Sequence, residues 1–236
     1  MKLRMLTLTA LVGASLNATL AHAQVDTPKP FDGADFGVDL KLVTNSIAVN
    51  NWMNPVFAAG IGTLDGTGGN QAIGDVTAGY SVLLGDDGVL GFGGSYDFIK
   101  SKLLLDPNGE FLNAPHQPVQ MKNHFSVYLA PGIRFGASGT TQFYVKLAYH
   151  SFKLHDQNTE VAIMDQTFNG FGYGAGIKSV IYDNWAVVVE VEQVNYTDKV
   201  DKVVNGGNTP NADVKPKTTS GLIGLQYTFD GTGLGL

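Results

Sequence analysis

A nucleophilic triad needs a serine, a histidine and a carboxylate, and these residue types occur close together at His150, Ser151 and Glu160. In this chemistry the imidazole lies within hydrogen-bond reach of the hydroxyl that it activates. The segment around His150 alternates apolar and polar residues, as a β-strand does, and adjacent side chains of a strand point to opposite faces. His150 and Ser151 are therefore expected to face apart, and the pattern does not favour an enzyme.

The other histidines and the glycine-rich segment give no better candidate for a site. His116, His124 and His155 lack the H-x-H or H-x3-H spacing that brings two imidazoles onto one metal ion. The glycines in residues 170–176 alternate within an extended segment, whereas a phosphate-binding loop leads into a helix. We expect neither a metal nor a cofactor.

Charged residues at alternate positions are the larger set that could do chemistry. They share a face opposite apolar neighbours, and the acids nearly balance the bases. The set comprises Asp39, Lys41, Asp75, Asp97, Arg134, Lys146, Lys178, Glu190 and Glu192. An isolated ion is costly to bury, so these side chains must pair if they share an enclosed space.

Eight segments with period-two alternation must position these residues. They lie near residues 36–43, 72–84, 90–98, 122–135, 142–150, 170–178, 185–196 and 218–229. Long connections (45–71, 100–121, 153–166 and 197–216) alternate with short turns (85–88, 136–140 and 182–184) without exception. A membrane-spanning up-and-down barrel produces this rhythm, whereas a soluble β-sandwich does not sort its loops by length.

The sequence therefore predicts an all-β fold, a transmembrane eight-stranded antiparallel up-and-down β-barrel over residues 36–229, with four long outer loops and three short periplasmic turns. Aromatic residues near the inner strand ends are expected to form a girdle where lipid meets water. These are Phe36, Phe92, Phe135, Phe143 and Trp185. Eight strands enclose only enough space for side chains, so the charged set is expected to form a salt-bridged lumen network.

The N-terminus indicates export. Lys2 and Arg4 precede an apolar run, and Ala21-His22-Ala23 has the small-x-small pattern of a cleavage site. Residues 1–23 are therefore predicted to be a signal peptide, cleaved after export through the Sec pathway. Residues 24–35, with two prolines, are predicted to form a flexible periplasmic lead-in, and residues 230–236 a short periplasmic tail.

Composition excludes several classes of protein. The net charge is −6, and the chain lacks the clustered Lys and Arg that phosphate contacts need, so no nucleic-acid partner is expected. The chain has no cysteine, which excludes a disulfide scaffold and a lipid-anchored lipoprotein. After the leader, no segment approaches the roughly 20 uninterrupted apolar residues of a membrane-spanning helix.

The closing segment ends in G-x-x-Y-x-F, at Gly224, Tyr227 and Phe229. This ending resembles the insertion signal of bacterial outer membrane β-barrels, although Leu222 stands where a polar residue is usual and seven residues follow Phe229. Together with the leader, the alternating strands and the loop rhythm, it makes the chain similar to the small OmpA-type, OmpX-type and opacity-protein barrels of the Gram-negative outer membrane.

That resemblance implies a non-enzymatic envelope protein that acts through its extracellular loops, in adhesion or envelope integrity. The implied partners are outer membrane lipid and lipopolysaccharide, the barrel-assembly machinery, and host-surface or envelope proteins. One alternative is a narrow pore or lateral route for small or hydrophobic solutes, with Trp52, Met53 and Phe57 as an apolar gate. A more distant alternative is lipid A modification, but the deacylases of this group have H-x-S, and Phe152 stands in the place of that serine.

Overall fold

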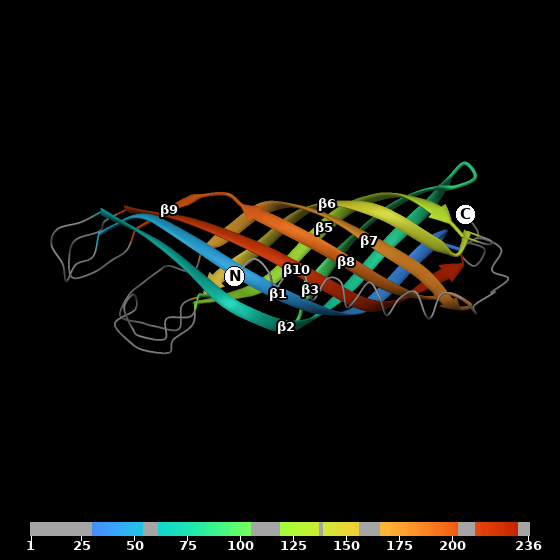
Figure 1. The fold of residues 1–236 in the computed structure, drawn as a ribbon, viewed down its shortest axis with the longest axis horizontal. Coiled ribbons are helices and arrows are strands. Elements are labelled where there is room, and N and C mark those ends of the chain that lie inside the picture. The colour runs from blue at the N-terminus through green and yellow to red at the C-terminus, as the bar shows by residue number, and fades with distance from the viewer. Residues whose placement is uncertain are drawn as a thin grey trace.

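Antiparallel β-strands form the regular structure of the described part of the chain, which covers residues 30–53, 61–104, 119–136, 139–155, 166–202 and 211–230 of a computed structural model. The strands are β1 (Gly33–Met53), β2 (Ile61–Leu84), β3 (Gly88–Asp97), β4 (Ser101–Leu104), β5 (Val119–Phe135), β6 (Thr141–His155), β7 (Thr167–Tyr182), β8 (Trp185–Tyr196), β9 (Lys199–Lys202) and β10 (Asn211–Asp230). Neighbouring strands pair in chain order, and β1 also pairs with β10, so the sheet closes into a barrel (Figure 1).

The short strands β4 and β9 continue β3 and β8 at the end of the barrel opposite the short turns. We call this the outer end, and the end with the short turns the inner end. β3 pairs with β5 as far as Tyr96 and Phe125, and β4 resumes the pairing where Ser101 meets Met121. In the same way, β8 pairs with β10, and β9 resumes that pairing at Lys199. The described strands therefore form a closed eight-stranded antiparallel barrel, which confirms the fold predicted from the alternating residues.

The strands extend further at the long-loop end than the sequence predicted. β1 continues to Met53 and β2 begins at Ile61, so the prediction of an irregular loop over residues 45–71 is wrong. The glycines and asparagines of this stretch suggested a loop, but β1 pairs on both sides there, with β2 and, as far as Asn50, with β10. Figure 1 shows β1, β2 and β9 projecting at this end, opposite the short turns.

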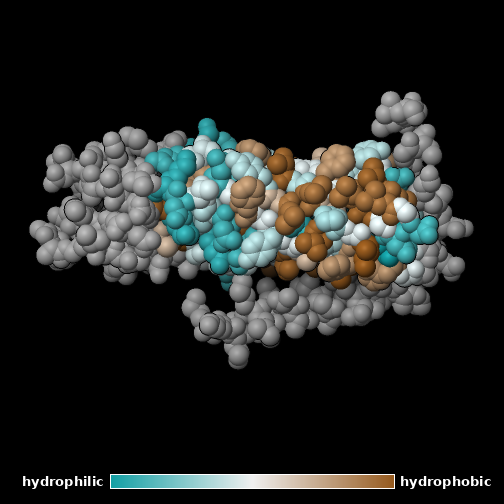
Figure 2. Space-filling model, turned by 90° about the horizontal axis from the view of Figure 1, so that it is seen from above, coloured by the Kyte–Doolittle hydropathy of each residue, from teal (hydrophilic) through white to brown (hydrophobic). Residues whose placement is uncertain are grey.

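The barrel has apolar residues on its outer face and polar residues on its inner face, the reverse of the arrangement in a soluble protein. Large apolar residues on the outer face are about half exposed, for example Leu40 at 52%, Val127 at 52% and Leu225 at 49%. On the face seen in Figure 2, hydrophobic residues gather in a band across the barrel, with hydrophilic residues beside it. Among the described residues, no helix has the length and hydropathy to cross a membrane.

Aromatic residues lie on the outer face where the sequence predicted a girdle. The exposed fractions are 48% for Phe36, 50% for Phe92, 47% for Phe135, 41% for Phe143 and 44% for Trp185. All five belong to the half of the barrel near the short turns, as their positions in β1, β3, β5, β6 and β8 require.

A phenylalanine closes the inner mouth of the lumen. Phe31 precedes β1 and is 1% exposed, and it packs with Val89, Val180 and Ala186. Its backbone has a positive φ of 69°, a conformation that costs a non-glycine residue energy and that the burial of the ring offsets. The end of the predicted flexible lead-in is thus part of the barrel, whereas residues 1–29 and 231–236 lie outside the described residues.

Candidate functional site

Lys41 of β1 lies in the lumen between two carboxylates of the neighbouring strands. Its ammonium group contacts Asp75 of β2 and lies 2.7 Å from Oδ1 of Asp97 on β3. The register places Asp75 opposite both Asp39 and Asp97, and like charges directly opposite repel. The positive charge of Lys41 offsets this repulsion. Lys41 and the three aspartates are all more than nine-tenths buried. We call Lys41, Asp75 and Asp97 the aspartate triad.

A second lysine has the same arrangement on the other side of the lumen. The Nζ atom of Lys146 on β6 is 2.8 Å from Glu190 Oε1 and 3.5 Å from Glu192 Oε2, both on β8. The hydroxyl of Tyr144 donates to Oε2 of Glu190 at 2.8 Å. We call Lys146, Glu190 and Glu192 the glutamate triad.

Glycines of β7 allow the glutamate triad to form. β7 lies between β6 and β8, and its residue opposite both Lys146 and Glu192 is Gly174, which has no side chain to separate them. At Gly176 a Cβ atom would overlap the ring of Tyr144. The alternating glycines of this strand therefore make room for a polar chain that passes over the strand.

Two histidines join the triads. His124 Nδ1 lies 2.5 Å from Asp97 Oδ2, and His150 Nε2 lies 3.0 Å from Glu192 Oε1. The inner nitrogens, His124 Nε2 and His150 Nδ1, are 3.1 Å apart, and the rings stack with centroids 5.2 Å apart. One connected set of polar contacts thus crosses the lumen from β2 to β8.

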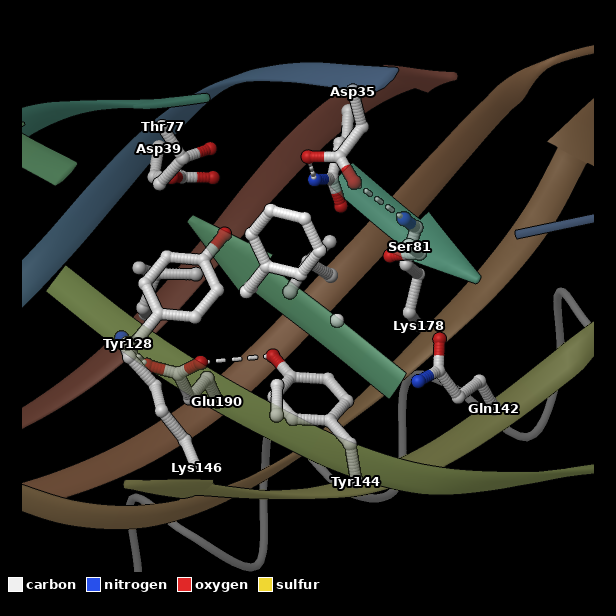
Figure 3. A pocket seen from close by; sticks show the side chains of 16 residues that line it. Asp35, Asp39, Thr77, Ser81, Tyr128, Gln142, Tyr144, Lys146, Lys178 and Glu190 are labelled. Carbon is white, nitrogen blue, oxygen red and sulfur yellow. Dashed lines mark hydrogen bonds and ion pairs between the residues drawn. The ribbon is translucent and has the colours of Figure 1, made fainter. Parts of the chain in front are cut away.

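A small cavity lies on the inner side of the glutamate triad (Figure 3). Its volume is about 60 Å³, room for a few water molecules. Asp39, which is 6% exposed, lines it together with Glu190 and Tyr144. Lys178 approaches Asp35 at 3.8 Å across the same space, and its ammonium group lies 5.3 Å from the centroid of the Phe31 ring. This end of the lumen is therefore polar and narrow.

An apolar cluster closes the lumen at the outer end. Its members come from six strands and are 1% to 6% exposed. They are Ile47, Met121, Phe152, Leu154, Phe168, Val194, Tyr196 and Val214. Phe152 stacks on Phe168 with centroids 5.4 Å apart, and Tyr196 meets Phe152 edge-on at 4.7 Å. The lumen therefore has a polar centre between two apolar closures.

The predicted charge network divides into eight residues that lie in the lumen and one that does not join them. The buried eight are Asp39, Lys41, Asp75, Asp97, Lys146, Lys178, Glu190 and Glu192. Arg134 differs from the prediction, because it lies at the inner rim and its guanidinium group donates to the backbone carbonyl of Asp86 in the β2–β3 turn. The prediction placed Arg134 by alternation alone. Alternation shows which face of the wall a residue is on, but not where it lies along the axis of the barrel.

The residue pattern did not indicate the link between the triads. His124 was considered only as a metal ligand and rejected, and His150 was considered as a catalytic residue, whereas the two are in contact. Both occupy the interior face, and the pairing of Ser126 with His150 brings them close. Counting residues back from the short turn between β5 and β6 would have revealed this proximity.

The residues of the predicted insertion signal have distinct surroundings. Tyr227 and Phe229 are on the outer face, where Tyr227 packs edge-on against Trp185 and Phe229. Gly224 faces the lumen, where a Cβ atom would overlap the carboxylate of Asp39. Gly224 thus has a packing role in the lumen.

The residue types of a catalytic triad are not brought together in the described structure. The two ring nitrogens of His150 contact His124 and Glu192. Ser151 lies at an outward-facing position of β6, opposite Phe125 of β5. Glu160 lies outside the described residues, as do His116, Phe57 and the side chains of Trp52 and Met53.

Comparisons with known proteins agree with this architecture. A family model described as the outer membrane protein beta-barrel domain matches residues 7–229. No curated protein sequence matches the chain.

Three solved structures are similar in fold. Neisserial surface protein A has 14% identity and a TM-score of 0.40, over 84% of this chain and 100% of that one. The attachment invasion locus protein Ail of Yersinia pestis, in complex with the heparin analogue sucrose octasulfate, has 14% identity and a TM-score of 0.41, over 84% and 99%. The outer membrane protease OmpT of Escherichia coli has 11% identity and a TM-score of 0.46, over 84% and 97%.

Proposed function

Because the chain belongs to the outer membrane β-barrel family, we propose that it is a non-enzymatic support in the outer membrane whose outward loops contact other molecules, in adhesion or envelope integrity. Export through the Sec pathway and cleavage after residue 23 are part of this proposal. The observation that carries it is the closed lumen, in which the triads and histidines form connected contacts between two apolar closures.

A closed lumen argues against a pore. The cavity beside the glutamate triad has room for only a few water molecules, and buried apolar side chains, those of the outer apolar cluster and of Phe31, lie on either side of the polar centre. Water or an ion would have to separate several buried ion pairs to pass, and removing one partner of such a pair costs about 3–5 kcal/mol. Binding residues in scaffold proteins concentrate on loops, which supports placing the activity there.

The surroundings of His150 and Ser151 support a role without catalysis. A histidine that activates a serine must have a ring nitrogen directed at the hydroxyl, whereas His150 is held between His124 and Glu192. The imidazole contributes to the polar chain of the lumen.

Loop replacement tests the proposal. Residues 54–60, 105–118, 156–165 and 203–210 would each be replaced by a short Gly/Ser linker, which leaves β1, β2 and the other strands intact. We expect every variant to fold, shown by heat-modifiable migration in gels, and at least one to lose attachment of whole cells or survival in serum. Unchanged attachment and survival in all four folded variants, against a deletion strain that loses them, would refute a role for the loops.

A further inference from the structure

The charges buried in the described part of the lumen do not balance. Six acids and three lysines there are each less than a tenth exposed, namely Asp35, Asp39, Asp75, Asp97, Glu190 and Glu192, and Lys41, Lys146 and Lys178. Six minus three leaves three negative charges in excess. His124 and His150 can carry at most one positive charge each, so at least one buried carboxylate has no side chain to compensate it. The near balance expected from the sequence fails because Asp35 joins the lumen and Arg134 does not.

Asp39 of β1 is the acid without a partner. Each of the other five contacts one of the three lysines. The carboxylate of Asp39 makes no hydrogen bond or ion pair with another described residue, although the residue is only 6% exposed. Lys41 and Lys146 act on Asp39 through space, but neither contacts it. The uncompensated negative charge of the lumen therefore lies at Asp39.

Polar groups without partners line the cavity that Asp39 faces. Figure 3 shows the carboxylate of Asp39 and the hydroxyl of Tyr128 directed into the same space. Four side chains of the cavity wall, like Asp39, make no hydrogen bond with another described residue, and these are Thr77, Ser81, Tyr128 and Gln142. Ser81 and Gln142 are, like Asp39, more than nine-tenths buried. Buried polar groups are normally hydrogen-bonded, so these groups are available to an occupant of the cavity.

Glycines of β2 and β3 make room for the hydroxyl of Tyr128. Gly79 and Gly93 are cross-strand partners, and Gly93 is also opposite Tyr128. The hydroxyl oxygen lies 2.7 Å and 3.0 Å from the positions that Cβ atoms would take at Gly93 and Gly79. Thr77 lies on the same face of β2, two residues from Gly79 and diagonal to Asp39. The register therefore supplies hydroxyl groups from two strands to the space beside the carboxylate.

The lining of the cavity matches a small monovalent cation. Carboxylate and hydroxyl oxygens are ligands for hard cations, and Ca²⁺ takes six to eight of them. Among the side chains that the structure describes, no group of three or more His, Cys, Asp or Glu is spaced to hold a metal ion, which argues against a divalent ion. A single positive charge balances the single carboxylate that lacks a partner. A cavity of about 60 Å³ admits such an ion with a few water molecules.

We propose that the lumen binds a monovalent cation of the sodium or potassium class at Asp39, with oxygen atoms of Thr77 and Tyr128 and with water completing its coordination. The ion neutralises the buried carboxylate and stabilises the folded barrel, because it binds the folded state and not the unfolded chain. The site goes beyond the proposed function, since it concerns the lumen and not the loops. Its ligands come from β1, β2 and β5, so no spacing in the sequence indicates it.

Stability in different chloride salts tests the site. Urea unfolding of the full mature barrel in vesicles of phosphatidylcholine would be measured in sodium, potassium and choline chloride at equal ionic strength, since choline is too large for the cavity. D39N removes the charge with little change in shape, and Y128F removes one hydroxyl ligand. D198N, which changes an exposed acid at the outer end, is the matched control. Heat-modifiable migration confirms that each variant is folded.

We expect the unfolding equilibrium constant of wild type and D198N to be about tenfold lower in sodium or potassium chloride than in choline chloride, as for a cation at about ten times its dissociation constant. The ratio should be smaller in Y128F and absent in D39N. In choline chloride D39N should be more stable than wild type, because it lacks the uncompensated charge.

Equal stability of wild type in all three salts would overturn the site and would show that a proton neutralises Asp39. The same salt dependence in folded D39N would also overturn it, because the cation would then bind elsewhere. A second measurement needs no variant. Crystals of the wild-type barrel grown in rubidium chloride should give an anomalous scattering peak beside Asp39, and the absence of a peak there would refute the proposal. Both measurements are independent of the loops, so this site and the proposed function can fail separately.

Discussion

The two triads of the lumen share one plan, a lysine between two carboxylates, but they differ in how many partners each carboxylate has. In the glutamate triad, Glu190 also accepts from Tyr144, and Glu192 contacts His150. In the aspartate triad, Asp97 contacts His124, but Oδ1 of the 1% exposed Asp75 has no hydrogen-bond partner among the described residues. A buried carboxylate with a second donor tolerates the loss of its lysine, and one without it does not. The buried carboxylates of the aspartate triad therefore depend more on their lysine than those of the glutamate triad do.

The largest effect is expected from removing the cation of the aspartate triad. Lys41→Met should leave Asp75 buried without its ion pair and cost about 3–5 kcal/mol of the free energy of unfolding, measured by urea titration in lipid vesicles. Asp75→Asn in the same background should recover part of this loss, because it removes the buried charge. If the double variant were less stable than Lys41→Met, Asp75 would have another source of stabilisation.

Removing the cation of the glutamate triad should be less damaging. Lys146→Met leaves Glu190 with Tyr144 and Glu192 with His150, so we expect a loss of about 2–3 kcal/mol by the same measurement. The comparison between the triads would be contradicted if this variant were less stable than Lys41→Met.

The hydroxyl of Tyr144 is the second donor to Glu190, after Lys146, and its contribution can be tested by itself. Tyr144→Phe removes one hydrogen bond to a charged group and keeps the ring, so it should cost about 1.5 kcal/mol. Combined with Lys146→Met, it should cost more than the two single losses together, because Glu190 then loses both donors. Strict additivity would show that the hydroxyl does not substitute for the lysine.

The exposed ion pair between Lys215 and Asp198 should give the smallest change in the free energy of unfolding. The side chains of Lys215 and Asp198 are each 57% exposed, and Lys215→Met should change the free energy of unfolding by less than about 1 kcal/mol. A larger loss would indicate that the method responds to hydrophobic substitution on any part of the barrel.

Alternation in the sequence was enough to predict the eight strands, their faces and the interior positions of residues such as Lys41 and Glu190. It could not predict partners, because contact across a lumen depends on register, tilt and the width of the barrel. The contact between His124 and His150 follows from the register that the short turn sets between β5 and β6, and counting from that turn would have found it. The inward position of Met121, in contrast, depends on a bulge at Asn123, which has a positive φ of 53°. Nothing in the residue pattern around Asn123 signalled that bulge.

The extent of the strands was also beyond the sequence pattern. Residues 45–53 have the composition of a loop, yet they continue β1 because β2 and β10 supply hydrogen bonds on both sides. Phe31 follows two prolines and was assigned to a flexible segment, and its burial depends on the shape of the inner mouth. Both are cases in which tertiary contacts outweigh local preference.

Single-channel recording tests the closed lumen most directly. The refolded, heat-modifiable protein would be inserted into a planar bilayer beside Lys146→Ala and Glu190→Ala, with insertion verified by protease protection. We predict that the inserted wild-type protein shows no discrete openings, because the polar chain and its two apolar closures fill the lumen. Discrete wild-type openings whose ion selectivity changes in either variant would show that the lumen conducts and would contradict the account.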